Sequence, residues 1–382
     1  MERATQLIHH PGAVCEHTGA VSPPIYQVST FAQEAVGANR GYDYSRTGNP
    51  TREVLERTIA VLEGADEANG LAFASGMAAI SACLTLLEAG DHVIATAGLY
   101  GGTYRLLTRI WERLGVATTF VDTGDLAAVE AAFTDRTALV FVETPSNPTM
   151  RITDLAAVAD LARRRDALLA VDNTFMSPWL QRPLEAGTDL VVHSATKFLG
   201  GHSDLIVGLA VCRDAALAKR LRRIQNAAGA VPGPLDCWLV VRGMKTLGVR
   251  MERGQATAAR IADWLGRRDE VEAVLWPGAG DGPAAQVHRR QADGPGAVLS
   301  FRLRPGLSGE VLCNHARVWT LAVSLGAVES LITLPARMTH LPYRPEEREA
   351  QGIDDRLVRL SVGLEDPDDL IADLAGALAA AK

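Results

Sequence analysis

The segment DLVVHSATKFLGGHS places a lysine where a short apolar run ends and small residues begin. Lys197 follows Ser194 and Thr196 and is followed by a pair of glycines, a setting typical of a tight loop at the end of a strand. A lysine that is desolvated among small residues becomes partly neutral, and its amine can then form a Schiff base with a carbonyl. The pattern therefore indicates covalent catalysis through an amine.

Two further apolar runs end in polar residues. ALVFVE leads into residues 144–147, which include Asn147, and ALLAV ends in Asp172. Ligands of open parallel sheets bind at the carboxyl edge, so we expect these residues to converge with Lys197. A carboxylate buried there needs a cationic partner.

Pyridoxal 5'-phosphate (PLP) offers a partner for both residues, because its aldehyde can react with the Lys197 amine and its protonated ring nitrogen can pair with the Asp172 carboxylate. Its phosphate requires amides and hydroxyls. We expect the amides at the start of a helix, and the ring face against a loop aromatic. The candidates are Ser75, Gly76, Met77, Ser194 and Thr196 for the phosphate and Tyr100 for the ring.

Simpler interpretations exist for each residue taken alone, since Ser75 suits an ordinary helix cap and Asp172 a turn. A dinucleotide site is the rival explanation of such a sheet, but no GxGxxG follows an early strand, and a P-loop is also missing. The five cysteines are scattered without metal-ligand spacing, which predicts reduced thiols and no metal site.

The elements that position these residues alternate between helices and short β-branched runs from residue 51 onward. The runs at 92–96, 118–122, 138–143, 167–172 and 189–194 predict buried parallel strands, and apolar spacing predicts a helix over 75–90. The sequence therefore predicts an α/β fold with a central, mostly parallel sheet. We divide it into an extended N-terminal arm (1–50), a PLP-binding α/β domain (51–232) and a smaller α+β C-terminal domain (233–382).

Composition excludes several classes of partner. A formal charge of −7 argues against nucleic acid, and the basic run at 163–165 is explained as a solvated helix end. No apolar stretch reaches the length of a membrane span, and the first residues lack the apolar core of a signal peptide. We expect a cytoplasmic protein whose partner is a small molecule.

The chain resembles the Cys/Met-metabolism family of PLP-dependent enzymes, which includes cystathionine γ-lyases, methionine γ-lyases and cystathionine γ-synthases. The lysine segment carries the likeness, together with YSRTGNPTR, FASGMAAI, LYGGTYR, ETPSNPT, VDNTF, SLGAVESLITLPARMTH and RLSVGLED in family order. The resemblance implies the aspartate-aminotransferase-like fold (fold type I) and a homotetramer built from two dimers with shared active sites.

The resemblance also implies roles for individual residues. Lys197 would bind the PLP aldehyde, Asp172 the ring nitrogen and Tyr100 the ring face, while Tyr44 and Arg46 would reach the phosphate of the neighbouring subunit. The remaining phosphate ligands would be Gly76, Met77, Ser194 and Thr196.

The substrate carboxylate would be held by Arg359, helped by Asn147 and the backbone near Ser324. Alternation in LVRLSVG puts Val358 and its apolar neighbours on one face of a strand and Arg359 on the other. An arginine fork in that place suits a planar carboxylate.

Four positions bear on the substrate. Gly102 stands where methionine γ-lyases carry a cysteine, whereas Asp43 and Arg105 are similar to positions of cystathionine-processing members. Val323 replaces the glutamate usual in cystathionine enzymes and would suit a short thioether, unless it serves only for packing.

We therefore expect a carbon–sulfur γ-lyase of sulfur amino acid metabolism that converts L-methionine or L-cystathionine to 2-oxobutyrate, ammonia and a thiol. The alternative is a cystathionine γ-synthase, which joins an O-acylhomoserine to cysteine. A scaffold without catalysis is disfavoured, because Lys197, Asp172, Tyr100 and Arg359 are all present.

Overall fold

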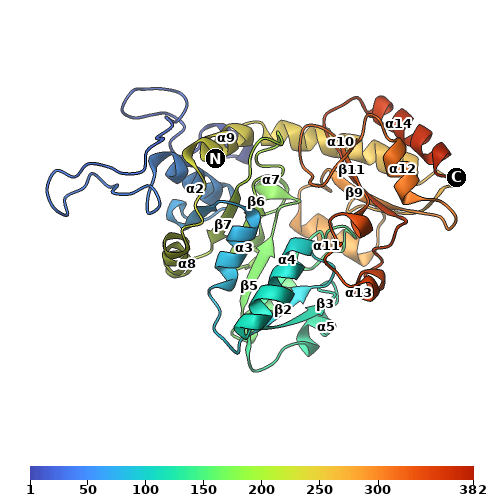
Figure 1. Ribbon diagram of the computed structural model, residues 1–382, viewed down its shortest axis with the longest axis horizontal. Helices are drawn as coiled ribbons and strands as arrows, with labels where there is room; N and C mark the ends of the chain where they lie inside the picture. Colours follow the sequence, from blue (N-terminus) through green and yellow to red (C-terminus); the bar gives the residue numbers. More distant parts are fainter.

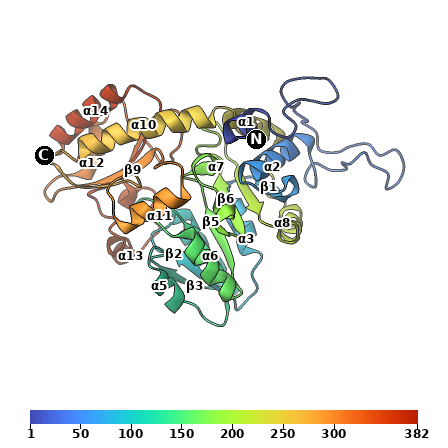
Figure 2. The same cartoon turned by 180° about the vertical axis from the view of Figure 1, so that it is seen from behind.

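Two β-sheets joined by a long helix dominate the computed structural model, which describes residues 1–382 (Figure 1). The connecting helix α10 (Leu247–Leu265) lies between the two sheets in sequence and runs along one side of the molecule in both views (Figures 1 and 2). A cavity lies between the carboxyl edge of the first sheet and one face of the second.

The first sheet has seven strands in the order β1-β7-β6-β5-β4-β2-β3. All neighbouring pairs are parallel except those made by β7, which is antiparallel to both β1 and β6. The strands are β1 (Gly70–Phe73), β2 (His92–Thr96), β3 (Ala117–Val121), β4 (Thr137–Glu143), β5 (Leu168–Asp172), β6 (Leu190–Ser194) and β7 (Gly208–Cys212). The five predicted strands are confirmed to within a residue or two, whereas β1 and β7 are additions.

Helices cover both faces of this sheet. Side chains alternate along each strand, so Leu139 and Phe141 of β4 pack against one helical layer, while Val140 and Val142 pack against the other. The first layer contains α3 (Gly76–Leu84), α4 (Gly101–Leu106) and α8 (Ala215–Ala228), and the second contains α5 (Leu126–Ala131) and α6 (Leu155–Arg164). The two views show these layers from opposite sides (Figures 1 and 2). The basic run at 163–165 is exposed at the end of α6, as predicted.

Helix α3 is shorter than predicted from its apolar spacing. It ends at Leu84, and the amides of Leu86 and Leu87 that follow donate hydrogen bonds to carbonyls three residues earlier, as in turns, and not four residues earlier, as in an α-helix. The Thr85 hydroxyl donates to the Ser81 carbonyl at 2.8 Å and so closes the last turn. Apolar periodicity continues beyond the helix because these turns still pack on the core.

The second sheet has five strands in the order β10-β11-β12-β9-β8 and is mostly antiparallel. Val358 and Leu360 of β12 lie in the apolar core, and Arg359 points to the other face, as alternation predicted. The strands are β8 (Val271–Leu275), β9 (Val298–Leu303), β10 (Thr320–Leu321), β11 (Leu331–Thr333) and β12 (Leu357–Ser361). The helices around them are α11 (Pro283–Gln291), α12 (Gly309–His315), α13 (Pro345–Ala350) and α14 (Pro367–Ala380).

The N-terminal segment is only partly an arm. Residues 3–8 form α1 (Arg3–Ile8), whose Leu7 is buried against the core, so this part of the predicted extended arm is helical and packed on the body. Leu7 supplies the apolar contact that holds α1 to the body. The following residues, up to the start of α2 (Pro50–Leu62), form long exposed loops that project away from the body (Figure 1).

The remaining α-helices are α7 (Ser177–Leu180) and α9 (Pro234–Met244), and short 3-10 and π-helical turns, such as residues 107–114, occur between the named elements. No helix in the structure has the length and apolar character needed to cross a membrane. The division of the chain at residues 50 and 232 stays a prediction.

Gly208 provides a test of the packing that places α3. A Cβ at this position would lie 2.0 Å from the Ser75 carbonyl oxygen, so Gly208→Ala must displace the backbone that begins α3. We expect this change to destabilise the protein by about 1–3 kcal/mol, as overpacking does. Thermal unfolding of the variant measures the loss.

Gly376→Ala is the matched control. Gly376 lies in the exposed part of α14 with no atom within 4 Å of its added Cβ, so alanine should stabilise the helix by up to about 1 kcal/mol. Equal unfolding temperatures for the two variants would contradict the packing described here.

Candidate active site

A cavity of about 510 Å³ opens at the carboxyl ends of β4, β5 and β6. It collects thirteen of the sixteen predicted site residues from the whole length of the chain. These are Ser75, Gly76, Met77, Tyr100, Arg105, Asn147, Asp172, Ser194, Thr196, Lys197, Val323, Ser324 and Arg359. The expected convergence at the sheet edge is therefore present in the structure.

Lys197 is half-buried and directs its amine into the cavity. Its Nζ donates to the Ser324 Oγ at 2.6 Å, and Ser324 adopts a left-handed backbone with φ of 93°. Burial, aided by the positive charge of Arg359, lowers the pKa of Lys197 to about 8. About a tenth of this amine is therefore neutral at pH 7, far more than for a lysine with the usual pKa of about 10.4, and the neutral amine is the form that acts as a Schiff-base nucleophile.

Asp172 ends β5 at the wall of the cavity, and no lysine, arginine or histidine side chain forms an ion pair with it. Its Oδ1 accepts from the Thr174 amide at 3.0 Å, and burial raises the pKa of its carboxyl group. The Thr174 hydroxyl accepts from the Ser194 amide at 2.8 Å, which ties the ends of β5 and β6 together. Thr174 was not predicted, although it lies in the VDNTF block.

The start of α3 faces the same cavity. The Ser75 hydroxyl caps the helix by accepting from the Ala78 amide at 3.1 Å, while the amides of Gly76 and Met77 lie in the first turn, where a helix offers no acceptor. A Cβ on Gly76 would lie 2.9 Å from the Ser194 Cβ, so glycine lets the helix start approach β6. Amides and a hydroxyl therefore meet at one point, which suits an anion.

Thr196 also lines this end of the cavity, but its hydroxyl is engaged. It accepts from the Val207 amide at 3.1 Å and lies 3.4 Å from the Val207 carbonyl oxygen. These contacts tie the loop that carries Lys197 to the segment before β7.

Glu143 is a site residue that was not predicted. Its carboxylate accepts from the Tyr100 amide at 3.0 Å and from the Asn147 amide at 2.8 Å. Burial, together with the nearby Asp172, raises the pKa of Glu143 to about 8. The available signal was its position at the end of the ALVFVE run, directly before the predicted loop.

Glu143 therefore fixes the backbone of Tyr100, whose ring lines the cavity. A Cβ at Gly102 would lie 2.4 Å from the Cε1 atom of that ring, so the ring position depends on glycine there.

Arg359 is 1% exposed, yet no carboxylate forms an ion pair with it. Its guanidinium donates to the Asn147 Oδ1 at 2.9 Å, to the Ser324 carbonyl at 2.6 Å and to the Thr333 hydroxyl at 3.2 Å, and its Nε has no partner. Burial lowers the pKa of Arg359 to about 10. A buried cation without a counter-ion is costly, which favours an anionic ligand in the cavity.

Three predicted residues lie away from this cavity. Asp43, Tyr44 and Arg46 belong to the projecting loops, and the Arg46 guanidinium donates to the Asn226 carbonyl at 2.8 Å. Tyr44 is 47% exposed. These side chains do not contribute to the site of their own chain.

The sequence profile described as Cys/Met metabolism PLP-dependent enzyme matches residues 4–379. The chain belongs to this family. The resemblance noted in the sequence is thus confirmed, and so are the PLP cofactor and the α/β fold of type I.

Named relatives of this Cys/Met-metabolism protein cover nearly its whole length. A cystathionine beta-lyase of Bacillus subtilis is 50% identical over 98% of this chain and 95% of its own, and a cystathionine gamma-lyase of the same organism is 46% identical over 99% of both. The crystal structure of a cystathionine gamma-lyase from Lactobacillus plantarum in complex with L-serine superposes with a TM-score of 0.97 at 48% identity, covering 100% of this chain and 99% of that one.

The cavity fits PLP on its own chemistry. Asp172 offers a carboxylate that forms no ion pair within the chain, and Lys197 offers an amine with a lowered pKa. The start of α3 offers amides for the phosphate. The structure holds no cluster of three or more metal-ligating side chains.

The pKa of Lys197 gives a pH-dependent prediction. Only the neutral amine reacts with acylating reagents, so acylation of Lys197 in PLP-free protein should rise with pH, reach its midpoint near pH 8 and level off about one pH unit higher. Free Nα-acetyl-lysine, with a pKa of about 10.4, should continue to gain reactivity well beyond that pH. Mass spectrometry of the Lys197 peptide measures the profile, and parallel profiles would contradict the lowered pKa.

Proposed function

We propose that this enzyme is a PLP-dependent carbon–sulfur γ-lyase that acts on L-cystathionine and, as a second substrate, on L-methionine. The observation that carries the proposal is Arg359, a buried cation that forms no ion pair within the chain and is linked through Ser324 to the amine of Lys197. An α-amino acid bound with its carboxylate on Arg359 would present its Cα near Lys197.

Each residue has a distinct part in this proposal. Bound PLP would supply an electron sink for the substrate Cα. Arg359, held by Asn147, fixes the carboxylate, and Asp172 keeps the cofactor ring nitrogen protonated. The amine of Lys197 would remove the Cα proton, pass it on to the bound cofactor and, neutral again, remove a Cβ proton. Gly76, Met77 and Ser194 would hold the phosphate, with Ser75 shaping the turn. Thr196 would join them by turning its hydroxyl proton from the Val207 carbonyl, 3.4 Å away, to the phosphate.

Tyr100 completes the set. Its ring lines the cavity and its backbone is fixed by Glu143, so its hydroxyl is available as the acid that protonates the departing sulfur. A proton delivered at that atom makes the thiol a better leaving group.

Substrate preference rests on the mouth of the cavity. Val323 is 59% exposed there, and Arg105 also lines the wall. Gly102 and the names of the relatives favour L-cystathionine, whereas an apolar Val323 favours the shorter L-methionine. Asp43 would reach the pocket only from a neighbouring subunit.

Two other outcomes have support in the relatives. The 50% identical cystathionine beta-lyase supports cleavage on the other side of the sulfur, which would give pyruvate and homocysteine. A cystathionine gamma-synthase of Xanthomonas oryzae pv. oryzae, solved with aminoacrylate and cysteine, has a TM-score of 0.96 at 41% identity and covers 100% of this chain and 98% of that one. It supports γ-replacement on an O-acylhomoserine.

Product analysis decides between these reactions. We expect L-cystathionine to yield 2-oxobutyrate, ammonia and cysteine, and L-methionine to yield 2-oxobutyrate, ammonia and methanethiol at a lower rate. Mass spectrometry of the oxo acids and thiols measures both, and Lys197→Ala serves as the inactive control. Formation of pyruvate and homocysteine would show β-cleavage and contradict γ-cleavage. If the only reaction is that of an O-acylhomoserine with cysteine, the enzyme is a synthase.

We further infer a cytoplasmic homotetramer in which the loops carrying Tyr44 and Arg46 complete the neighbouring active site. Their position away from their own cavity supports this arrangement. The exposed apolar side chains along the loops, Val14, Val21, Ile25, Val28 and Val36, support burial against another copy.

Shared sites predict complementation. Lys197→Ala and Arg46→Ala chains should each have low activity alone, because one lacks the amine and the other a phosphate ligand. After co-refolding, a mixed pair contains one site with both residues, so activity should return. If the activity of the co-refolded mixture never exceeds the summed activities of the two variants, the shared site is contradicted.

A further inference from the structure

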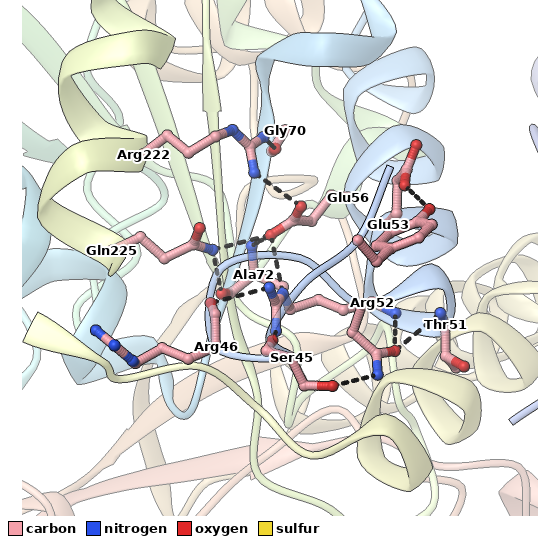
Figure 3. A network of polar contacts seen from close by, with 12 residues as sticks. Ser45, Arg46, Thr51, Arg52, Glu53, Glu56, Gly70, Ala72, Arg222 and Gln225 are labelled. Atoms are coloured by element: carbon pink, nitrogen blue, oxygen red, sulfur yellow. Dashed lines mark hydrogen bonds and ion pairs between the residues drawn. The ribbon is translucent and has the colours of Figure 1, made fainter. Parts of the chain in front are cut away.

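Arg52 is a buried arginine outside the cavity, at the base of the projecting loops (Figure 3). It lies in the first turn of α2, is 2% exposed, and donates to two consecutive backbone carbonyls, Ser45 at 2.6 Å and Arg46 at 3.1 Å. These peptides belong to the turn that carries Tyr44 and Arg46, in which the amides of Thr47 and Gly48 donate back to the Tyr44 carbonyl. One guanidinium therefore fixes the orientation of the turn.

Glu56 connects this arginine to the first sheet. Its Oε1 lies 3.6 Å from the Arg52 Nε and accepts from the Ala72 amide of β1 at 2.9 Å. Helix α8 completes the network, because Gln225 donates to the same oxygen at 2.9 Å and Arg222 donates to Oε2 at 3.0 Å. Figure 3 shows these side chains converging on Glu56.

The hydrogen-bond network around Glu56 joins two segments that are both proposed to bind the phosphate of PLP. Strand β1 ends at Phe73, immediately before the Ser75–Met77 turn of the chain's own cavity, while the Tyr44–Thr47 turn is the one assigned above to the neighbouring cavity. A planar fork suits two adjacent carbonyls, whereas a lysine is a point donor that cannot hold both in one geometry.

We propose that Arg52 and Glu56 are positioning residues that orient the Tyr44–Thr47 turn and thereby set the affinity of the neighbouring subunit for the phosphate of PLP. The inference rests on the proposed shared site. Arg52 acts through the backbone of Ser45 and Arg46 and does not itself touch the cofactor.

The test compares PLP with pyridoxal, which lacks the phosphate, in binding to cofactor-free protein followed by absorbance. Arg52→Gln should lower the affinity for PLP by about tenfold, the scale of a lost charge-assisted contact, and leave the affinity for pyridoxal nearly unchanged. A general loss of structure would weaken both ligands equally, so the ratio of the two affinities isolates the phosphate.

Arg57→Gln is the matched control on the same helix. Arg57 is only partly buried and pairs with Glu67 at the surface, so this variant should keep the wild-type ratio. A similar change in both variants would overturn the role of Arg52.

Arg46→Ala separates the two proposals. If Arg46→Ala leaves the ratio unchanged, the shared phosphate site fails, and this inference fails with it. If Arg46→Ala lowers the ratio but Arg52→Gln does not, the shared site stands and the positioning role is wrong. If both single variants lower the PLP-to-pyridoxal affinity ratio, the double variant should lose less binding free energy than the two single variants lose together, because Arg52 acts through Arg46.

Arg52→Lys decides the case if Arg52→Gln does not fold. It keeps the positive charge beside Glu56 but loses the fork, so the PLP-to-pyridoxal ratio should still fall, by less than the glutamine variant would cause. A wild-type ratio in a folded Arg52→Lys protein overturns the inference.

Discussion

The structure depends on keeping unlike charges out of water at one edge of a sheet. Lys197, Asp172 and Arg359 face a single cavity, and none of them forms an ion pair within the chain. Burial lowers the pKa of Lys197 and Arg359 and raises that of Asp172, which is the expected response to loss of solvent. The groups of PLP and of an amino-acid substrate are those that would satisfy these charges: an aldehyde, a cationic ring nitrogen and a carboxylate. The folded chain thus tolerates an electrostatic cost that its ligands remove.

Two sheets are needed to assemble this arrangement. The first supplies Asp172 and Lys197 at the ends of neighbouring strands, and the second supplies Arg359 from the inward face of β12. Ser324 connects them, since its hydroxyl accepts from Lys197 and its carbonyl accepts from Arg359. A residue with positive φ at this junction, at a typical cost of about 1–3 kcal/mol, is consistent with a backbone constrained by its site.

The projecting loops extend the same logic beyond one chain. They bury little of their own apolar surface, yet their base is fixed by Arg52 and Glu56, which are almost fully buried. A rigid base beneath exposed loops favours binding to a neighbouring subunit, because the loops are already ordered and lose less conformational entropy on association. In the proposed assembly, Tyr44 and Arg46 would add ligands to a cavity whose remaining walls come from a different copy.

The sequence by itself determined the family, the cofactor and most of the site. Lys197, Asp172 and Asn147 follow strands that β-branched runs reveal, and the positions of such strands in a parallel sheet imply where their ends meet. Glu143 and Thr174 escaped prediction because their importance lies in backbone amides that only the folded chain brings within reach. Helix α3 ended early for a similar reason, since packing continued the apolar pattern past its last turn. The tertiary structure alone decided that Arg359 lacks a counter-ion, that Arg52 holds the turn at 45–46, and that Tyr44 and Arg46 lie outside their own cavity. Each is a long-range contact or its absence, and local residue patterns record short-range preference only.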